Sequence, residues 1–103
     1  MYSLEYLPIA RRDLVEAVSY ISHDLGSAEA ALRLAEEVER AGERLQQFPY
    51  AWPVYQASRP LEREYRKLLV ENFFLFYWVD EQRRLVTVAR VIYARRDYGK
   101  LLQ

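Results

Sequence analysis

The sequence predicts an α+β fold in which an antiparallel helical hairpin packs on one β-sheet. Apolar residues recur at helical spacing over residues 9–24 and again over 28–48. Three stretches rich in β-branched and aromatic residues follow after residue 64, with short connections between them. A short alternating stretch comes before the first helix, and we expect it to join the same sheet.

Local signals place the ends of the first elements. Residues 2–7 alternate as a strand with one buried face. Pro8 suits the first turn of a helix, where its missing N–H leaves no hydrogen bond unmade. Gly26 fits the left-handed position after the first helix, Ser27 fits the N-cap of the second, and Pro49 ends the second. The apolar stripe expected on the second helix is Ala31, Leu34, Ala35, Val38, Ala41, Leu45 and Phe48.

Residues 49–63 contain three of the four prolines and have no regular period, so they predict a loop. We expect Trp52 and Tyr55 to hold this loop on the body of the protein. The strands expected after the loop cover residues 65–70, 73–79 and 85–94, and their short turns make them an antiparallel meander. The middle strand, FFLFYWV, is apolar on both faces and should be central. The helices can cover one face, and we expect the other to be partly open to a partner.

Composition narrows the classes of function. The length suits a single domain over residues 1–103. The chain has no cysteine, which excludes disulfides, thiolate catalysis and cysteine-based zinc sites. The longest apolar run, residues 73–79, is far too short to span a bilayer, and the N-terminus lacks the pattern of a secretory signal. We therefore expect a soluble cytoplasmic protein that needs no metal or cofactor and makes no membrane contact.

Charge is divided unevenly along the chain. Residues 1–56 contain five basic and nine acidic side chains, whereas residues 57–103 contain ten basic and six acidic ones. The acidic half is the predicted helical part and the basic half is the predicted sheet. A protein with no net charge can still present one basic face to a nucleic acid or to an acidic partner. The alternative is that the charges only keep two surfaces hydrated.

Three motifs in order resemble one family. Residues 2–21 read YSLEYLPIARRDLVEAVSYI, residues 64–79 read EYRKLLVENFFLFYWV, and residues 88–97 read VARVIYARRD. Together they resemble the RelE/ParE superfamily of toxins from type II toxin–antitoxin systems, over nearly the whole chain. The resemblance implies growth arrest, a link to plasmid stabilisation, and an antitoxin protein that binds the toxin in a hetero-oligomer.

The resemblance leaves three activities open. RelE-like members are mRNA interferases, which enter the ribosomal A site and cut mRNA without a metal ion. ParE-like members inhibit DNA gyrase and carry out no chemistry of their own. A degenerate member would only bind its antitoxin. Whether the chain is an enzyme, and whether its target is the ribosome or gyrase, therefore stays open at this point.

Five residues match positions that carry catalysis in RelE-like members. Arg66 and Lys67 lie on the first strand of the meander, where those members have catalytic lysines. Arg95 and Arg96 follow the last strand, where those members have a basic residue, and Tyr98 could stand for their late tyrosine. Positive charge near a phosphate that gains negative charge would stabilise the transition state of cleavage.

The chain also departs from the RelE-like pattern. Ribonuclease members have an arginine in the central strand, where this chain has Phe73 and Phe74. Adjacent residues of a strand point to opposite faces, so only one of Arg66 and Lys67 can line a given site. Arg90 is expected to form a structural ion pair.

Overall fold

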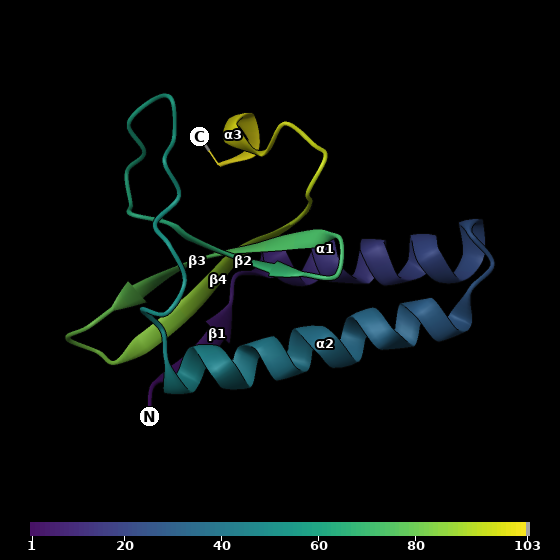
Figure 1. Ribbon diagram of the computed structural model, residues 1–103, viewed down its shortest axis with the longest axis horizontal. Coiled ribbons are helices and arrows are strands. Elements are labelled where there is room, and N and C mark those ends of the chain that lie inside the picture. Colours follow the sequence, from purple (N-terminus) through teal and green to yellow (C-terminus); the bar gives the residue numbers. More distant parts are fainter. Residues whose placement is uncertain (103) are drawn as a thin grey trace.

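A helical hairpin lies on one face of a four-stranded sheet (Figure 1). The computed structural model describes residues 1–102. Its elements in order are β1 (Ser3–Tyr6), α1 (Pro8–Ser19), the π-helical turn η1 (Tyr20–Asp24), α2 (Ala28–Gln47), β2 (Arg66–Val70), β3 (Phe73–Asp80), β4 (Leu85–Tyr93) and α3 (Tyr98–Leu101). The predicted α+β class and the order of its main elements are confirmed. The sequence pattern did not predict the π-helical turn or the short helix α3.

The sheet has the strand order β1-β4-β3-β2 and is mixed. Strands β2, β3 and β4 form the predicted antiparallel meander, with β3 at an inner position. Strand β1 joins the sheet as expected. It lies beside β4 and runs parallel to it, with Ser3 opposite Leu85 and Tyr6 opposite Val88. Short turns impose the antiparallel direction within the meander, whereas no short turn links β1 to β4.

The residues predicted to begin and end the two helices lie at those positions in the structure. Pro8 lies in the first turn of α1, and Gly26 has a φ of +67° between the two helices. The Ser27 side chain accepts a hydrogen bond of 3.1 Å from the backbone N–H of Ala30. The prediction that Phe48 belongs to the buried stripe of the second helix is wrong. Phe48 lies at the C-cap of α2 and is 61% exposed. Its backbone has already left the helix, so helical periodicity no longer directs its side chain to the core.

The main core lies between the helices and the sheet. Its buried members are Ala10, Ala17, Leu34, Val38, Ala41, Leu45, Leu68, Val70, Leu75, Tyr77, Val86, Val88 and Val91. A β-bulge in β4 determines which of its residues face this core. Phe76 is opposite Arg90 and Tyr77 is opposite Val88, so Ala89 has no residue opposite it in β3. Regular alternation would direct Val88 and Val91 to opposite faces of the sheet, and the bulge lets both join the core that faces the helices.

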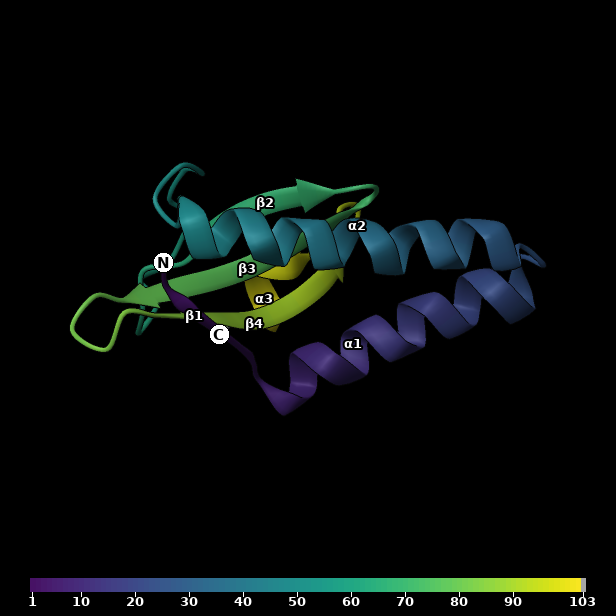
Figure 2. The same cartoon turned by 90° about the horizontal axis from the view of Figure 1, so that it is seen from below.

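A smaller core covers the face of the sheet that points away from the helices. Phe76 and Ile92 are almost fully buried there. Figure 1 shows the long loop before β2 and the helix α3 on the opposite side of the sheet from α2, and Figure 2 shows α3 behind the sheet when the helices are in front. Trp52 packs in the main core and Tyr55 in the smaller one, so both hold the loop as predicted. The chain covers this face more fully than the sequence predicts, because its tail folds back as α3. None of the helices in residues 1–102 is both long and apolar enough to cross a membrane.

Candidate functional site

The five residues predicted for catalysis lie in three different surroundings. Arg66 is opposite Tyr77 in the sheet and therefore faces the helices, whereas Lys67 is opposite Phe76 and faces α3. This agrees with the alternation expected from their adjacent positions. Arg95 and Arg96 lie in the turn that follows β4. Among the five, Lys67 and Tyr98 are in side-chain contact, and the backbone N–H of Tyr98 donates a hydrogen bond to the carbonyl of Arg96.

Lys67 lies against three aromatic rings. Its ammonium nitrogen is 4.5 Å from the ring centroid of Phe74, 5.3 Å from that of Tyr98 and 5.5 Å from that of Tyr55. The Tyr98 ring also packs on Phe76, with 5.2 Å between centroids. These distances are within the range of cation–π attraction. The cation is thus held in an aromatic cluster that links β2, the long loop and α3.

Arg66 is occupied by contacts with the long loop. One terminal nitrogen donates a hydrogen bond of 2.7 Å to the backbone carbonyl of Trp52. The other lies 3.8 Å from a carboxylate oxygen of Glu64, and the guanidinium carbon is 5.1 Å from the ring centroid of Tyr50. The side chain is only 18% exposed. In this geometry Arg66 holds the loop against the sheet.

Arg95 and Arg96 are exposed. Asp97, the neighbour that could neutralise them, instead pairs with Lys100 at 3.8 Å. No ion pair of either arginine occurs within residues 1–102. The turn therefore presents two cations to solvent. Across the same described residues, no group of three His, Asp or Glu side chains is arranged to hold a metal ion.

Arg90 forms the structural ion pair expected of it, and its partner is Asp13 on α1. The Arg90 Nε and Nη2 atoms donate to the two carboxylate oxygens over 2.8 and 3.0 Å. The same carboxylate accepts a hydrogen bond from the backbone N–H of Val91, and Arg90 Nη1 donates to the carbonyl of Leu101. Asp13 thereby fastens α1 to β4, while Arg90 also fastens the C-terminal helix.

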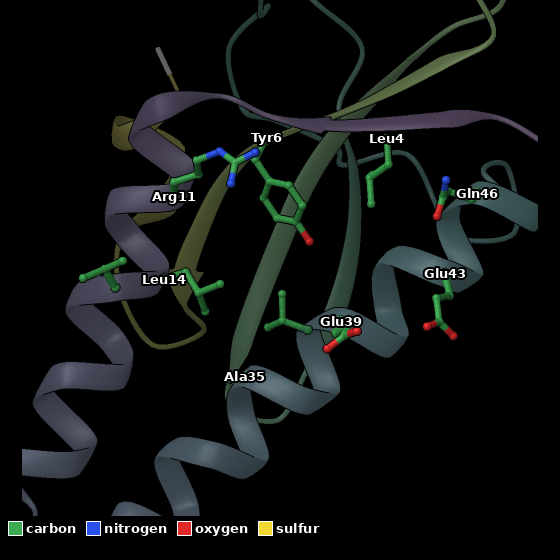
Figure 3. Close-up of a pocket in the computed structure, with 10 residues that line it drawn as sticks. Leu4, Tyr6, Arg11, Leu14, Ala35, Glu39, Glu43 and Gln46 are labelled. Carbon is green, nitrogen blue, oxygen red and sulfur yellow. The ribbon is translucent and has the colours of Figure 1, made fainter.

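Sequence reasoning missed a groove between the two helices. It has a volume of about 510 Å³ and opens between α1 and α2 beside β1 (Figure 3). Its lining residues are Leu4, Tyr6, Arg11, Leu14, Val15, Ala35, Val38, Glu39, Glu43 and Gln46. We call this site the helix groove. One sequence signal could have indicated it: Val15 is apolar but lies outside the helical stripe that Leu14, Val18 and Ile21 form on the first helix. In the structure it is 67% exposed.

The two walls of the helix groove carry opposite charge. Arg11 stands on α1, with its guanidinium carbon 5.6 Å from the ring centroid of Tyr6, and Glu39 and Glu43 stand on α2 (Figure 3). Burial raises the pKa of Tyr6; the charge of Arg11 opposes this rise and that of Glu39 adds to it. The groove thus combines an apolar floor with a cationic rim and an acidic rim.

Comparison of the sequence with models of known protein families identifies one matching family. A model of the ParE toxin of the type II toxin–antitoxin system parDE matches residues 4–98. No curated protein matches the chain significantly. Among solved structures, the chromosomal ParDE system from P. aeruginosa is similar with a TM-score of 0.69 and 23% identity, over 92% of this chain and 98% of that one.

Two further solved structures share the fold. The toxin–antitoxin complex RelBE2 from Mycobacterium tuberculosis has a TM-score of 0.61 and 22% identity, over 89% of this chain and 90% of that one. A metal-bound toxin from Helicobacter pylori has a TM-score of 0.61 and 17% identity, over 90% and 94%. These structures support the RelE/ParE fold, and the family match spans almost the whole sequence. The chain therefore belongs to the ParE toxin family of type II toxin–antitoxin systems.

Proposed function

We propose that this toxin arrests growth as ParE-like members do, by binding DNA gyrase, with no chemistry of its own. The observation that carries the proposal is that the cations expected to act on a phosphate do not converge. Arg66 and Lys67 face opposite sides of the sheet, and each already contacts groups of the protein itself. Cleavage of RNA needs fixed positive charge at one phosphate and an aligned 2′-hydroxyl.

A second candidate is ribosome-dependent mRNA cleavage. One observation favours it: the ammonium group of Lys67 and the ring of Tyr98 are neighbours, so a cation and a phenol share one site. RNA would have to compete with the three aromatic rings that contact the ammonium group of Lys67. We therefore rank cleavage below gyrase binding.

The two candidates differ in their products. If the proposal holds, the purified toxin inhibits gyrase supercoiling or traps cleaved DNA complexes, and mRNA stays intact while growth stops. Primer extension on translated mRNA is the matching assay for cleavage, and cuts inside A-site codons with unaffected gyrase would overturn the proposal. Unimpaired growth of cells that contain the soluble toxin would favour a degenerate member that only binds its antitoxin.

The exposed cations after β4 are the best candidates for the contact with the target. The double substitution Arg95→Glu and Arg96→Glu should abolish growth arrest and gyrase inhibition together. Both side chains are exposed and form no ion pair within the described residues, so the free energy of unfolding should change by only about 0.5 kcal/mol. Full gyrase inhibition by the double variant would exclude this turn from the target contact.

We further propose that the helix groove receives the antitoxin. The ParDE and RelBE2 neighbours are described as toxin–antitoxin assemblies. An amphipathic helix fits a groove with an apolar floor, and it would place basic residues beside Glu39 and Glu43 and acidic residues beside Arg11. Calorimetric titration with the cognate antitoxin should give an affinity tighter than micromolar.

Two exposed apolar residues make a matched test of this docking site. Val15 lines the groove and is 67% exposed, whereas Leu32 is 60% exposed and lies outside the groove lining. Val15→Glu should weaken antitoxin binding at least about tenfold, because it places a charge in an apolar contact. Leu32→Glu should leave binding unchanged. Equal effects of the two substitutions would move the antitoxin site elsewhere.

A further inference from the structure

A second pocket lies on the face of the sheet away from the helices. It has a volume of about 520 Å³ and is built mainly by the long loop, with strand β3 and the C-terminal segment closing it. The residues that matter for its chemistry are Arg59, Leu61, Arg63, Tyr65, Trp78 and Leu102. We call it the outer-face pocket. It shares no lining residue with the helix groove.

An arginine in this pocket is held in a fixed orientation. The guanidinium carbon of Arg63 is 4.3 Å from the ring centroid of Trp78, and Tyr65 packs edge-on against Trp78 with 5.7 Å between centroids. A guanidinium group held over an aromatic face keeps its N–H donors directed outward in its own plane, where they match a carboxylate. The contact with Trp78 also limits the side-chain freedom that binding would otherwise remove.

The outer-face pocket is lined by the guanidinium groups of Arg59 and Arg63 and by one carboxylate, that of Glu62, so its lining carries a net positive charge. Neither Arg59 nor Arg63 forms an ion pair within residues 1–102, and Glu64, which follows Arg63, is directed to Arg66. Burial raises the pKa of Tyr65; the charge of Arg63 opposes this rise and that of Glu62 adds to it. An anion that enters the pocket therefore meets guanidinium donors beside a phenol.

Leu61 and Leu102 give the same pocket an apolar side, and Leu102 is among the buried residues of the smaller core. A ligand that only supplied an anion would leave this side uncovered. The surrounding loop also argues against a polyanion, because residues 59–64 contain two arginines and two glutamates. Nucleic-acid binding relies on several uncompensated cations along the backbone, whereas one carboxylate needs only one guanidinium group.

We propose that the outer-face pocket binds a peptide of a partner protein in which an acidic residue is followed by an aromatic or large apolar residue. The carboxylate pairs with Arg63, with Arg59 close by on the rim. The apolar side chain packs against Leu61 and Leu102. This is a protein-recognition site on the opposite side of the sheet from the helix groove.

The two tryptophans make the proposal directly testable by NMR. Trp78 lines the outer-face pocket, whereas Trp52 packs against the main core, so its indole N–H serves as an internal control. The probe is the peptide acetyl-Leu-Asp-Phe-amide, titrated into the ¹⁵N-labelled toxin. Its neutral counterpart is acetyl-Leu-Asn-Phe-amide. We expect a saturable shift of the Trp78 indole signal, an unchanged Trp52 signal, and an affinity about tenfold higher for the acidic peptide, as one charge-assisted pair implies.

Substitutions separate specific recognition from general charge attraction. Arg63→Gln should remove the preference for the acidic peptide, whereas Arg44→Gln, an equal change of charge on an exposed residue of α2, should keep it. The proposal is overturned if both peptides bind equally well, if Trp78 does not respond to the acidic peptide, or if both variants behave alike. It is also overturned if a short oligothymidylate shifts Trp78 at near-physiological ionic strength while the peptide does not, because the pocket would then bind a polynucleotide.

Discussion

Replacing Asp13 with asparagine should destabilise the fold by about 2–3 kcal/mol. Asp13 accepts two hydrogen bonds from Arg90 and one from the backbone N–H of Val91, all between 2.8 and 3.0 Å. The side chains of Arg90 and Asp13 are only 15% and 13% exposed. An amide in place of this carboxylate would leave the guanidinium charge largely shielded from water and without its counter-charge.

The magnitude follows from this burial. Removing one partner of a fully buried ion pair costs roughly 3–5 kcal/mol. Asparagine keeps the shape and one acceptor oxygen, and the pair retains slight contact with water, so we expect a smaller loss. For a domain of this size, each kcal/mol lowers the melting temperature by about 4–8 °C. The midpoint should therefore fall by about 10 °C or more.

Urea unfolding followed by tryptophan fluorescence measures this loss, with circular dichroism to show that the variant is folded. The matched control is Glu37→Gln, which removes the carboxylate of an exposed pair with Arg40 on α2. That change should alter the free energy of unfolding by about 0.5 kcal/mol or less. If Asp13→Asn costs no more than Glu37→Gln, the Asp13–Arg90 pair does not fasten α1 to the sheet as described.

Three further predictions concern single groups. Gly26→Ala should cost about 1 kcal/mol, because the φ of +67° disfavours a side chain even though the added carbon meets open space; an unchanged melting temperature would contradict this. The free energy of unfolding should fall between pH 10 and 12, because burial raises the pKa of Tyr77 to about 12 in the folded protein, whereas this tyrosine has a pKa near 10.0 in the unfolded chain. Tyr77→Phe should flatten this decline in alkaline urea titrations, and an equally steep decline would refute the assignment to Tyr77. Hydrogen bonds from Tyr2 and Tyr50 hold the pKa of Glu81 below its ordinary value, so Tyr2→Phe should raise this pKa in an NMR titration, and an unchanged pKa would count against the Tyr2 hydrogen bond.

The parts of the fold that the sequence predicts best are those set by neighbouring residues. Pro8, Gly26 and Ser27 each act through the backbone of their own turn, so the helical hairpin could be placed before any tertiary contact was known. The direction of β1 and the helix α3 depend instead on contacts between distant segments. The bulge at Ala89 is similar, because regular alternation alone does not reveal where a strand departs from it.

The candidate site was predictable to the same limited extent. Alternation along β2 correctly separates Arg66 from Lys67. It cannot show that Tyr55 and Tyr98, from two distant segments, place their rings near the Lys67 ammonium group. The helix groove was missed because its lining comes from three elements, α1, α2 and β1, which meet only in the folded protein (Figure 3).

The parallel pairing of β1 with β4 has a consequence for the order of events during synthesis. The helical hairpin can form early from local contacts, but Ser3 finds its partner only after Leu85 has left the ribosome. Leu4 and Tyr6 line the helix groove from β1, so this wall is fixed only once the sheet has closed. A protein that contacts α1, α2 and β1 together in the helix groove therefore binds the fully folded toxin and not the nascent chain.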